Sequence, residues 1–292
     1  MSLGNPGMDK QDTGKAGLIA FLVNVFLFII KLFAGLLSGS LAILSDAFNS
    51  FMDILSYLIV FFSIKLAQKG PDADHPFGHR RAEPLSALLI GIISGVLAFE
   101  IMKAAVDNVL FGDFAISITP IVFGIVLLSI LLKFASYIYL RQKASSSMST
   151  SLEAISIDSR NDVFASSIVL IGIIGVYFDF PVLDDAAAIL IAFYILYSGY
   201  SIARKNIDYL MGAKPEKKVL GRIRKAAKSV KGLKRLSSTR AHYVGDRVHV
   251  EISITLDKKL TPKKTHDIGE RVQKEVEKID VVSRAFVHID YE

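Results

Sequence analysis

The chain has 292 residues, 52% of them hydrophobic, and a mean hydropathy of +0.45. This apolar excess excludes an ordinary water-soluble globular domain for most of the chain. The sequence has no cysteine, which excludes disulfides and thiolate metal sites. The net charge is +6, and its positive excess lies mostly after residue 203. We interpret this basic region as facing the anionic inner leaflet of a membrane, not nucleic acid.

Six apolar segments predict six transmembrane helices, at roughly residues 15–38, 41–66, 83–110, 115–140, 150–178 and 183–207. The connections SGS, FGDFAIS and FDFPVLDD contain no Lys or Arg. Basic residues gather instead in the other connections and ends: Lys10, Lys15, Lys65, Lys69, Arg80, Arg81, Arg141 and Lys143. The positive-inside rule therefore predicts a protein of the cytoplasmic membrane with both termini in the cytoplasm.

The expected domains are a cytoplasmic tail (1–14), a six-helix membrane domain (15–208) and a cytoplasmic α+β domain (209–292). The polar segment SSSMSTS predicts a linker before the fifth span. In the last domain, PEKKVLGRIRKAAKSV predicts an amphipathic helix with Pro215 in its first turn. TPKKTHDIGERVQKEVEKI predicts another, with Thr261 as N-cap.

Three segments of the last domain predict strands: GLKRLSSTRAHYV, VHVEISITLD and VVSRAFVHIDY. Gly245 and Asp246 predict the turn between the first two. The order αββαβ predicts a small sandwich that resembles a ferredoxin-like half.

Two polar pairs lie inside hydrophobic helices, Asn49 with Asp53 and Asp158 with Asp162. Ionised side chains inside a membrane are costly and usually mark an ion or substrate path. Residues four apart share one helix face, about 6 Å from each other. Two such faces turned toward each other would place four oxygen donors around one bare divalent cation.

The donor types bear on which cation binds. All four are oxygen donors and no histidine falls within a span, which favours Mn²⁺ or Fe²⁺, with Zn²⁺ still open. Three carboxylates around a dication carry a net negative charge, so protons should compete with the metal. This predicts proton antiport.

An alternative interpretation makes these residues a structural hydrogen-bond or charge-pair network, in which Arg160 neutralises one aspartate. Asp46 is a candidate relay carboxylate or a polar cap near the outer interface. Lys31, Lys103 and Lys133 should snorkel or pair across helices.

The motifs SGSLAILSDAF…D, D-x-x-x-D and HPFGHRRAEPLSAL together resemble the cation diffusion facilitator family over nearly the whole chain. The resemblance implies a homodimeric transporter, not an enzyme, that exports divalent metals in exchange for protons. Asn49, Asp53, Asp158 and Asp162 match its four transport-site positions. Asn in the second span with Asp in the fifth resembles the manganese branch.

The resemblance also implies further metal positions. Asp72, His75 and His79 match a loop site, which a helical segment would assemble, although Pro76 opposes a regular helix. The alternative is a solvated loop facing lipid headgroups.

In the cytoplasmic domain, His266, His288 and Asp290 match regulatory metal positions, whereas Lys234 and Ser253 depart from them. His242 and His249 are candidates for a different, weaker site. The alternative for these positions is a set of polar side chains on an exposed face of the sheet.

A charge lock in relatives implies a partner for Arg81. Its acidic position aligns with Gly212 here, and Asp208, one turn earlier, is the candidate replacement.

We expect a proton-coupled Mn²⁺ exporter that needs no cofactor; the divalent metal ion is what it transports. The nearest alternative is a Zn²⁺, Fe²⁺ or Cd²⁺ exporter with the same machinery. More distant alternatives are a Mg²⁺-dependent membrane prenyltransferase, disfavoured by the few acidic residues, and a scaffold that binds metal without transporting it.

Overall fold

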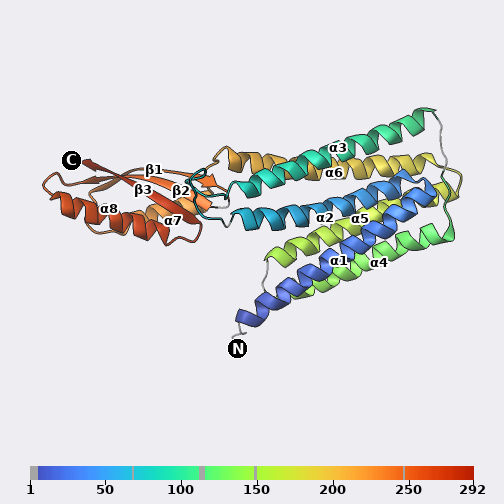
Figure 1. Ribbon diagram of the computed structural model, residues 1–292, viewed down its shortest axis with the longest axis horizontal. Coiled ribbons are helices and arrows are strands. Elements are labelled where there is room, and N and C mark those ends of the chain that lie inside the picture. Colours follow the sequence, from blue (N-terminus) through green and yellow to red (C-terminus); the bar gives the residue numbers. More distant parts are fainter. Residues whose placement is uncertain (1–5, 68, 112–115, 148–149, 246) are drawn as a thin grey trace. The chain divides into compact units, whose positions relative to one another are not determined.

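The computed structural model describes residues 6–67, 69–111, 116–147, 150–245 and 247–292. Two compact units are present, Met1–Leu58 with Ile90–Ser201, and Ile59–Leu89 with Ile202–Glu292. The elements, labelled in Figure 1, are α1 (Pro6–Ser38), α2 (Leu41–Ala67), α3 (Ala82–Phe111), α4 (Pro120–Ser147), α5 (Thr150–Tyr177), α6 (Val182–Leu210), α7 (Lys217–Lys228), β1 (Arg235–Val244), β2 (Arg247–Leu256), α8 (Pro262–Glu277) and β3 (Val282–Tyr291).

The six predicted spans are confirmed as helices. Within the described residues, α1 to α6 are each long and apolar enough to cross a membrane. The fourth helix begins later than expected, at Pro120, because Thr119 caps it by accepting a hydrogen bond from the Val122 amide at 3.3 Å. The expected linker SSSMSTS is wrong in its described part. Helix α4 runs to Ser147 and α5 begins at Thr150, because serine does not break a helix as Gly or Pro does.

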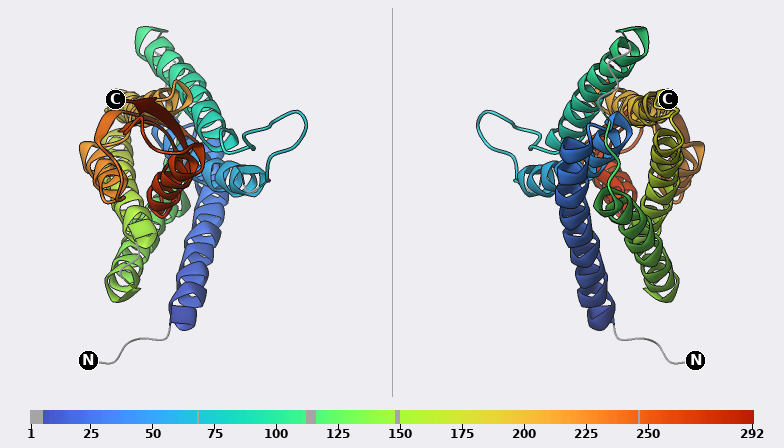
Figure 2. Two further views of the ribbon diagram at one scale, coloured as in Figure 1. Left: turned by 90° about the vertical axis from the view of Figure 1, so that its left-hand side faces the viewer. Right: turned by 90° about the vertical axis from the view of Figure 1, so that its right-hand side faces the viewer.

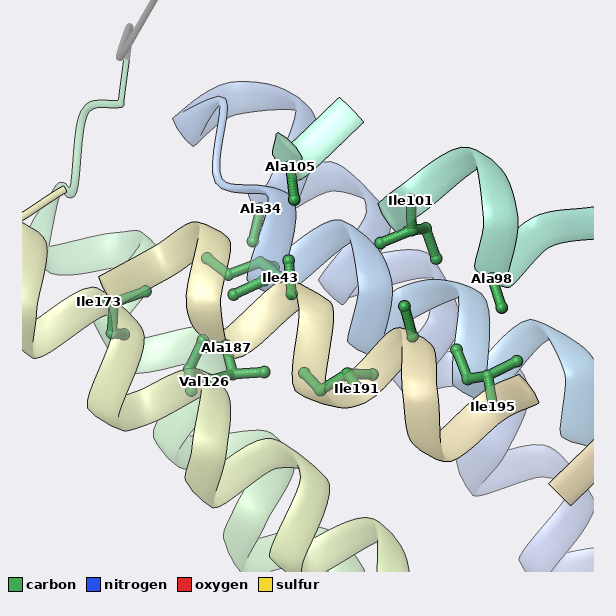
Figure 3. Close-up of a cluster of buried hydrophobic side chains, with 14 of the residues drawn as sticks. Ala34, Ile43, Ala98, Ile101, Ala105, Val126, Ile173, Ala187, Ile191 and Ile195 are labelled. Carbon is green, nitrogen blue, oxygen red and sulfur yellow. The ribbon is translucent and has the colours of Figure 1, made fainter. Parts of the chain in front are cut away.

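Small and β-branched side chains form the core of the first unit (Figure 3). Alanines let the helix backbones approach closely, as is common between membrane helices. Every one of the six helices contributes to this cluster, through Ala34, Ile43, Ala98, Ile101, Ala105, Val126, Ile173, Ala187, Ile191 and Ile195 among others.

A polar contact secures the start of α2. Ser40 donates to Asp184 of α6 at 2.5 Å and accepts the Ile43 amide at 3.1 Å. Asp184 also accepts the Ala42 amide at 3.2 Å. The first turn of α2 is therefore capped both locally and by a buried carboxylate from α6, which the sequence did not indicate.

The end of helix α6, which lies in the second unit, carries a glycine motif. Gly212 has φ +75° and donates to the Tyr209 carbonyl, while Ala213 donates to the Asp208 carbonyl at 2.8 Å. This pair of bonds is a Schellman motif, in which glycine adopts the left-handed conformation at least cost. Gly212 therefore ends the helix, which accounts for a glycine at this position.

The C-terminal part of the second unit has the predicted αββαβ order. The sheet order is β1-β2-β3, with β1 and β2 antiparallel and β2 and β3 parallel. Helices α7 and α8 lie on the same face of the sheet (Figure 1). Thr261 caps α8 as predicted, by accepting the Lys264 amide. Helix α7 begins slightly later than predicted, because Pro215 precedes its N-cap, Glu216.

Candidate metal site

The two polar pairs of α2 and α5 face each other within the first unit. The Asn49 side-chain amide donates to Asp162 Oδ1 at 2.9 Å, which joins the two helices directly. Asn49 and Asp162 are buried, and Asp53 lies one turn beyond Asn49 on the same face of α2. Asp158 lies one turn before Asp162 and is exposed. The structure therefore places the predicted donors of the two helices on facing surfaces.

A lysine from a third helix lies among these donors. Lys133 of α4 is only 1% exposed, and its ammonium hydrogen-bonds to Asp162 Oδ2. The same nitrogen lies 3.6 Å from Asp53 Oδ2 and donates to Asn24 Oδ1 of α1 at 2.6 Å. Asp53 and Asp162 thus converge on a single cation, which is the side chain of Lys133.

The sequence indicated a cross-helix pairing for Lys133 but not its partners. It offered Arg160 as the residue that neutralises an aspartate, and that assignment is wrong. In the described residues Arg160 is exposed and its only side-chain partner is the neighbouring Asn161, at 3.5 Å. Lys103, the third of the three lysines expected to snorkel or pair across helices, is exposed on α3.

Asp46 lies in a second buried charge network. Its Oδ2 is 2.8 Å from the Lys31 ammonium of α1, and both side chains are at most 2% exposed. Ser166 of α5 donates to Asp46 Oδ2 at 2.8 Å, and Lys31 donates to Ser166 at 3.1 Å and to Ser50 at 3.4 Å. Asp46 is therefore an interior ion-pair partner and not a cap at an interface. Its role as a relay stays a prediction.

The loop between α2 and α3 belongs to the second unit and is drawn in blue-green in Figure 2. It brings together Asp72, His75 and His79. One ligand atom from each lies within 4.8 Å of the others. The carboxylate of Asp72 is 3.5 Å from His75 Nδ1 and 3.3 Å from His79 Nε2. The His75 backbone amide donates to Asp72 Oδ1 at 2.7 Å and so lowers the pKa of Asp72.

This loop is not helical, whereas the sequence analysis expected a helical segment to bring the three side chains together. Pro76 prevents a regular helix, and Gly78, with φ +80°, forms a turn. The turn, rather than the helical spacing, brings the two imidazoles together, with their ring centroids 4.5 Å apart.

The expected regulatory cluster of the C-terminal domain is only partly assembled. His288 and Asp290 lie on the same face of β3, with His288 Nε2 3.2 Å from Asp290 Oδ1. His266 lies elsewhere, because α8 packs against the opposite face, where its Gly269 lies against Ile289. The sheet therefore lies between His266 and His288 within one chain, and the metal-binding role of each stays a prediction. His242 and His249 are cross-strand partners with rings 5.8 Å apart.

Arg81 and Asp208 were expected to form a charge lock. Across the described ranges no ion pair joins them in this state; Asp208 is exposed and its carbonyl belongs to the motif that ends α6. The lock therefore stays a hypothesis.

Six spans, facing carboxylates on two of them and a C-terminal α+β domain are together typical of a polytopic transporter. A cation efflux transmembrane domain model matches residues 17–211, and a cation efflux protein cytoplasmic domain model matches residues 215–292. The chain belongs to the cation efflux family, and it is a multi-pass membrane transporter of divalent metals, not an enzyme. Its second domain is the family's dimerisation domain, which supports a homodimer.

Three relatives align over most of the chain. An uncharacterised transporter of Methanocaldococcus jannaschii is 32% identical, over 96% of this chain and 99% of that protein. The magnetosome protein MamM of Magnetospirillum gryphiswaldense is 31% identical, over 89% of this chain and 82% of that protein. The manganese efflux system protein MneS of Bacillus subtilis is 26% identical, over 97% of this chain and 98% of that protein.

One solved structure, a variant of the MamM C-terminal domain in its copper form, is 31% identical. The match covers 26% of the present chain and 96% of the chain in the solved structure, with a TM-score of 0.25.

Proposed function

We propose that the protein exports Mn²⁺ from the cytosol in exchange for protons, through a site formed by Asn49, Asp53, Asp158 and Asp162. The observation that carries the proposal is the convergence of Asp53 and Asp162 on one cation inside the helix bundle. A place that already holds an ammonium between two carboxylates has the charge and the geometry to hold a metal ion.

The preference for Mn²⁺ is inferred from the donors. The Asn49 amide and three carboxylates would bind a metal through oxygen atoms, the ligands that suit Mn²⁺. The site has no imidazole or thiolate, the ligands that favour Zn²⁺. The name of MneS, a manganese efflux protein, supports this choice. Export of Zn²⁺, Fe²⁺ or Cd²⁺ through the same site is the alternative, and a selectivity series decides between them.

Proton coupling follows from the charge of the site. Crowded carboxylates bind protons more readily than isolated ones, so protons arriving from outside displace the metal. Mn²⁺ enters an inward-facing cavity, the helices rock, and the site opens outward. The charge of the loops supports a location in the cytoplasmic membrane with both termini inside.

Flux into proteoliposomes tests the proposal. Mn²⁺ transport driven by a pH gradient should be lost in Asp53→Ala and in Asp162→Ala. Asp107→Ala is the matched control, because Asp107 is an exposed carboxylate of α3 outside the site. Transport at the parent rate in both site variants would refute the site. Mn²⁺ binding without flux in the parent would favour a scaffold.

A further inference from the structure

Both carboxylate oxygens of Asp162 already accept a hydrogen bond from a side chain that a metal ion would have to share or displace. Its Oδ1 accepts the Asn49 amide and its Oδ2 accepts the Lys133 ammonium. Neither donor group has a lone pair to offer a metal. A metal that binds Asp162 therefore lies next to these two donor groups, and their charge decides whether they can stay.

Lys133 is the partner that a dication must displace. Its ammonium lies in contact with Asp162 and 3.6 Å from Asp53 Oδ2, so it fills the place between the two carboxylates. A second cation at that place would meet strong repulsion from the ammonium at short range. Asn49, by contrast, is neutral, and rotation of its amide would present an oxygen to the metal.

We infer that Lys133 is a tethered competitor of the transported metal, an inference that rests on the proposed transport site. In the metal-free site its ammonium holds Asp53 and Asp162 together, and it withdraws from between them when the metal binds. Asn24 of α1, 2.6 Å from the ammonium, is the anchor toward which the side chain withdraws.

The charges of the site agree with this role. Three carboxylates and one dication leave a single negative charge. An ammonium kept nearby, on Asn24, brings the loaded site to neutrality. Such a site avoids the cost of a net charge inside the membrane, and the retained ammonium weakens the hold on the metal. Lys133 would therefore favour release of the metal.

A purely structural role for Lys133 makes the opposite prediction. If the lysine only ties α1, α4 and α5 together, its removal loosens the site, and metal affinity falls or stays constant. If it competes with the metal, its removal increases affinity. The sign of the change separates the two roles.

The test is Mn²⁺ binding by calorimetry on the full chain in nanodiscs, at one fixed pH. Lys133→Met keeps an unbranched side chain of nearly the same length and removes the charge. It should bind Mn²⁺ more than about tenfold more tightly than the parent, with slower release. Lys133→Arg keeps the charge and should not bind more tightly. Lys103→Met, which removes an exposed lysine of α3, should match the parent. Equal or weaker binding by folded Lys133→Met would overturn the inference.

A second measurement covers the case in which Lys133→Met does not fold. In a structure of the parent with Mn²⁺ located by anomalous scattering, the Lys133 ammonium should no longer contact Asp162. A metal bound to Asp53 and Asp162 with that contact intact would also overturn the inference. If the parent binds no Mn²⁺ that depends on Asp53, the proposed function itself fails, which is a different outcome.

Discussion

Lys31 of α1 and Asp46 of α2 form an ion pair of 2.8 Å in which neither side chain is more than 2% exposed. Serines from α2 and α5 surround the pair and share its hydrogen bonds. Because both charges are out of reach of solvent, each depends on the other for compensation. The pair joins α1 to α2 close to the proposed metal site.

We expect either Lys31→Met or Asp46→Asn to destabilise the protein by about 3–5 kcal/mol, because each leaves a buried charge without its partner. The double variant should recover most of that loss. Thermal unfolding in detergent measures the cycle, with Lys103→Met as a control. Losses that simply add in the double variant would mean that the two charges are not coupled.

Asn49→His should shift transport preference from Mn²⁺ toward Zn²⁺. The substitution puts an imidazole nitrogen, a softer ligand, where the amide now contacts Asp162. Competitive flux of the two metals in proteoliposomes gives the ratio directly. An unchanged ratio, in a variant that still transports, would remove Asn49 from the metal's ligands.

Asp72→Asn should remove a metal ion bound by the loop without abolishing flux through the membrane site. Asp72 is the only carboxylate of the loop cluster, and its lowered pKa keeps it ionised and able to bind a cation. Asp74→Asn, which changes a nearby exposed carboxylate outside the cluster, is the control. Metal stoichiometry by elemental analysis should fall by one ion per chain only in the first variant.

Acidification should destabilise the second unit through His249. Burial, followed by the charges of His242, Arg284 and Arg81, lowers the pKa of His249 from its ordinary 6.5. The unfolded chain then binds the proton more readily than the folded one, so stability is lost as pH falls below 6.5 toward the lower folded-state pKa.

His249→Gln should flatten this pH dependence of the melting temperature, whereas His266→Gln, at an exposed position of α8, should keep it. A parent and a His249→Gln variant with the same slope would contradict the prediction.

Ser40→Ala should destabilise the start of α2 by about 1–2 kcal/mol, because it removes an N-cap and leaves one hydrogen bond of Asp184 unmade. Hydrogen exchange of the Ile43 amide reports the loss locally. Ser201→Ala, at an exposed serine of α6, should have no such effect.

The sequence by itself determined the spans and the αββαβ order of the C-terminal domain, and it indicated four candidate oxygen donors. These features are local: hydropathy, helix caps such as Thr261, and the four-residue spacing of Asp158 and Asp162. The same rules placed the start of α4 too early, before its Thr119 cap. They also misplaced the SSSMSTS segment, whose described polar residues continue helices instead of ending them.

Only the tertiary structure decided which charges meet. Lys133 of α4 reaches Asp162, Asp53 and Asn24 on three other helices, and Lys31 reaches Asp46. It also separated His266 from His288 across the sheet and formed the loop cluster through a turn. Pairing between distant segments depends on how helices and strands pack, and periodicity along one chain carries no information about that packing.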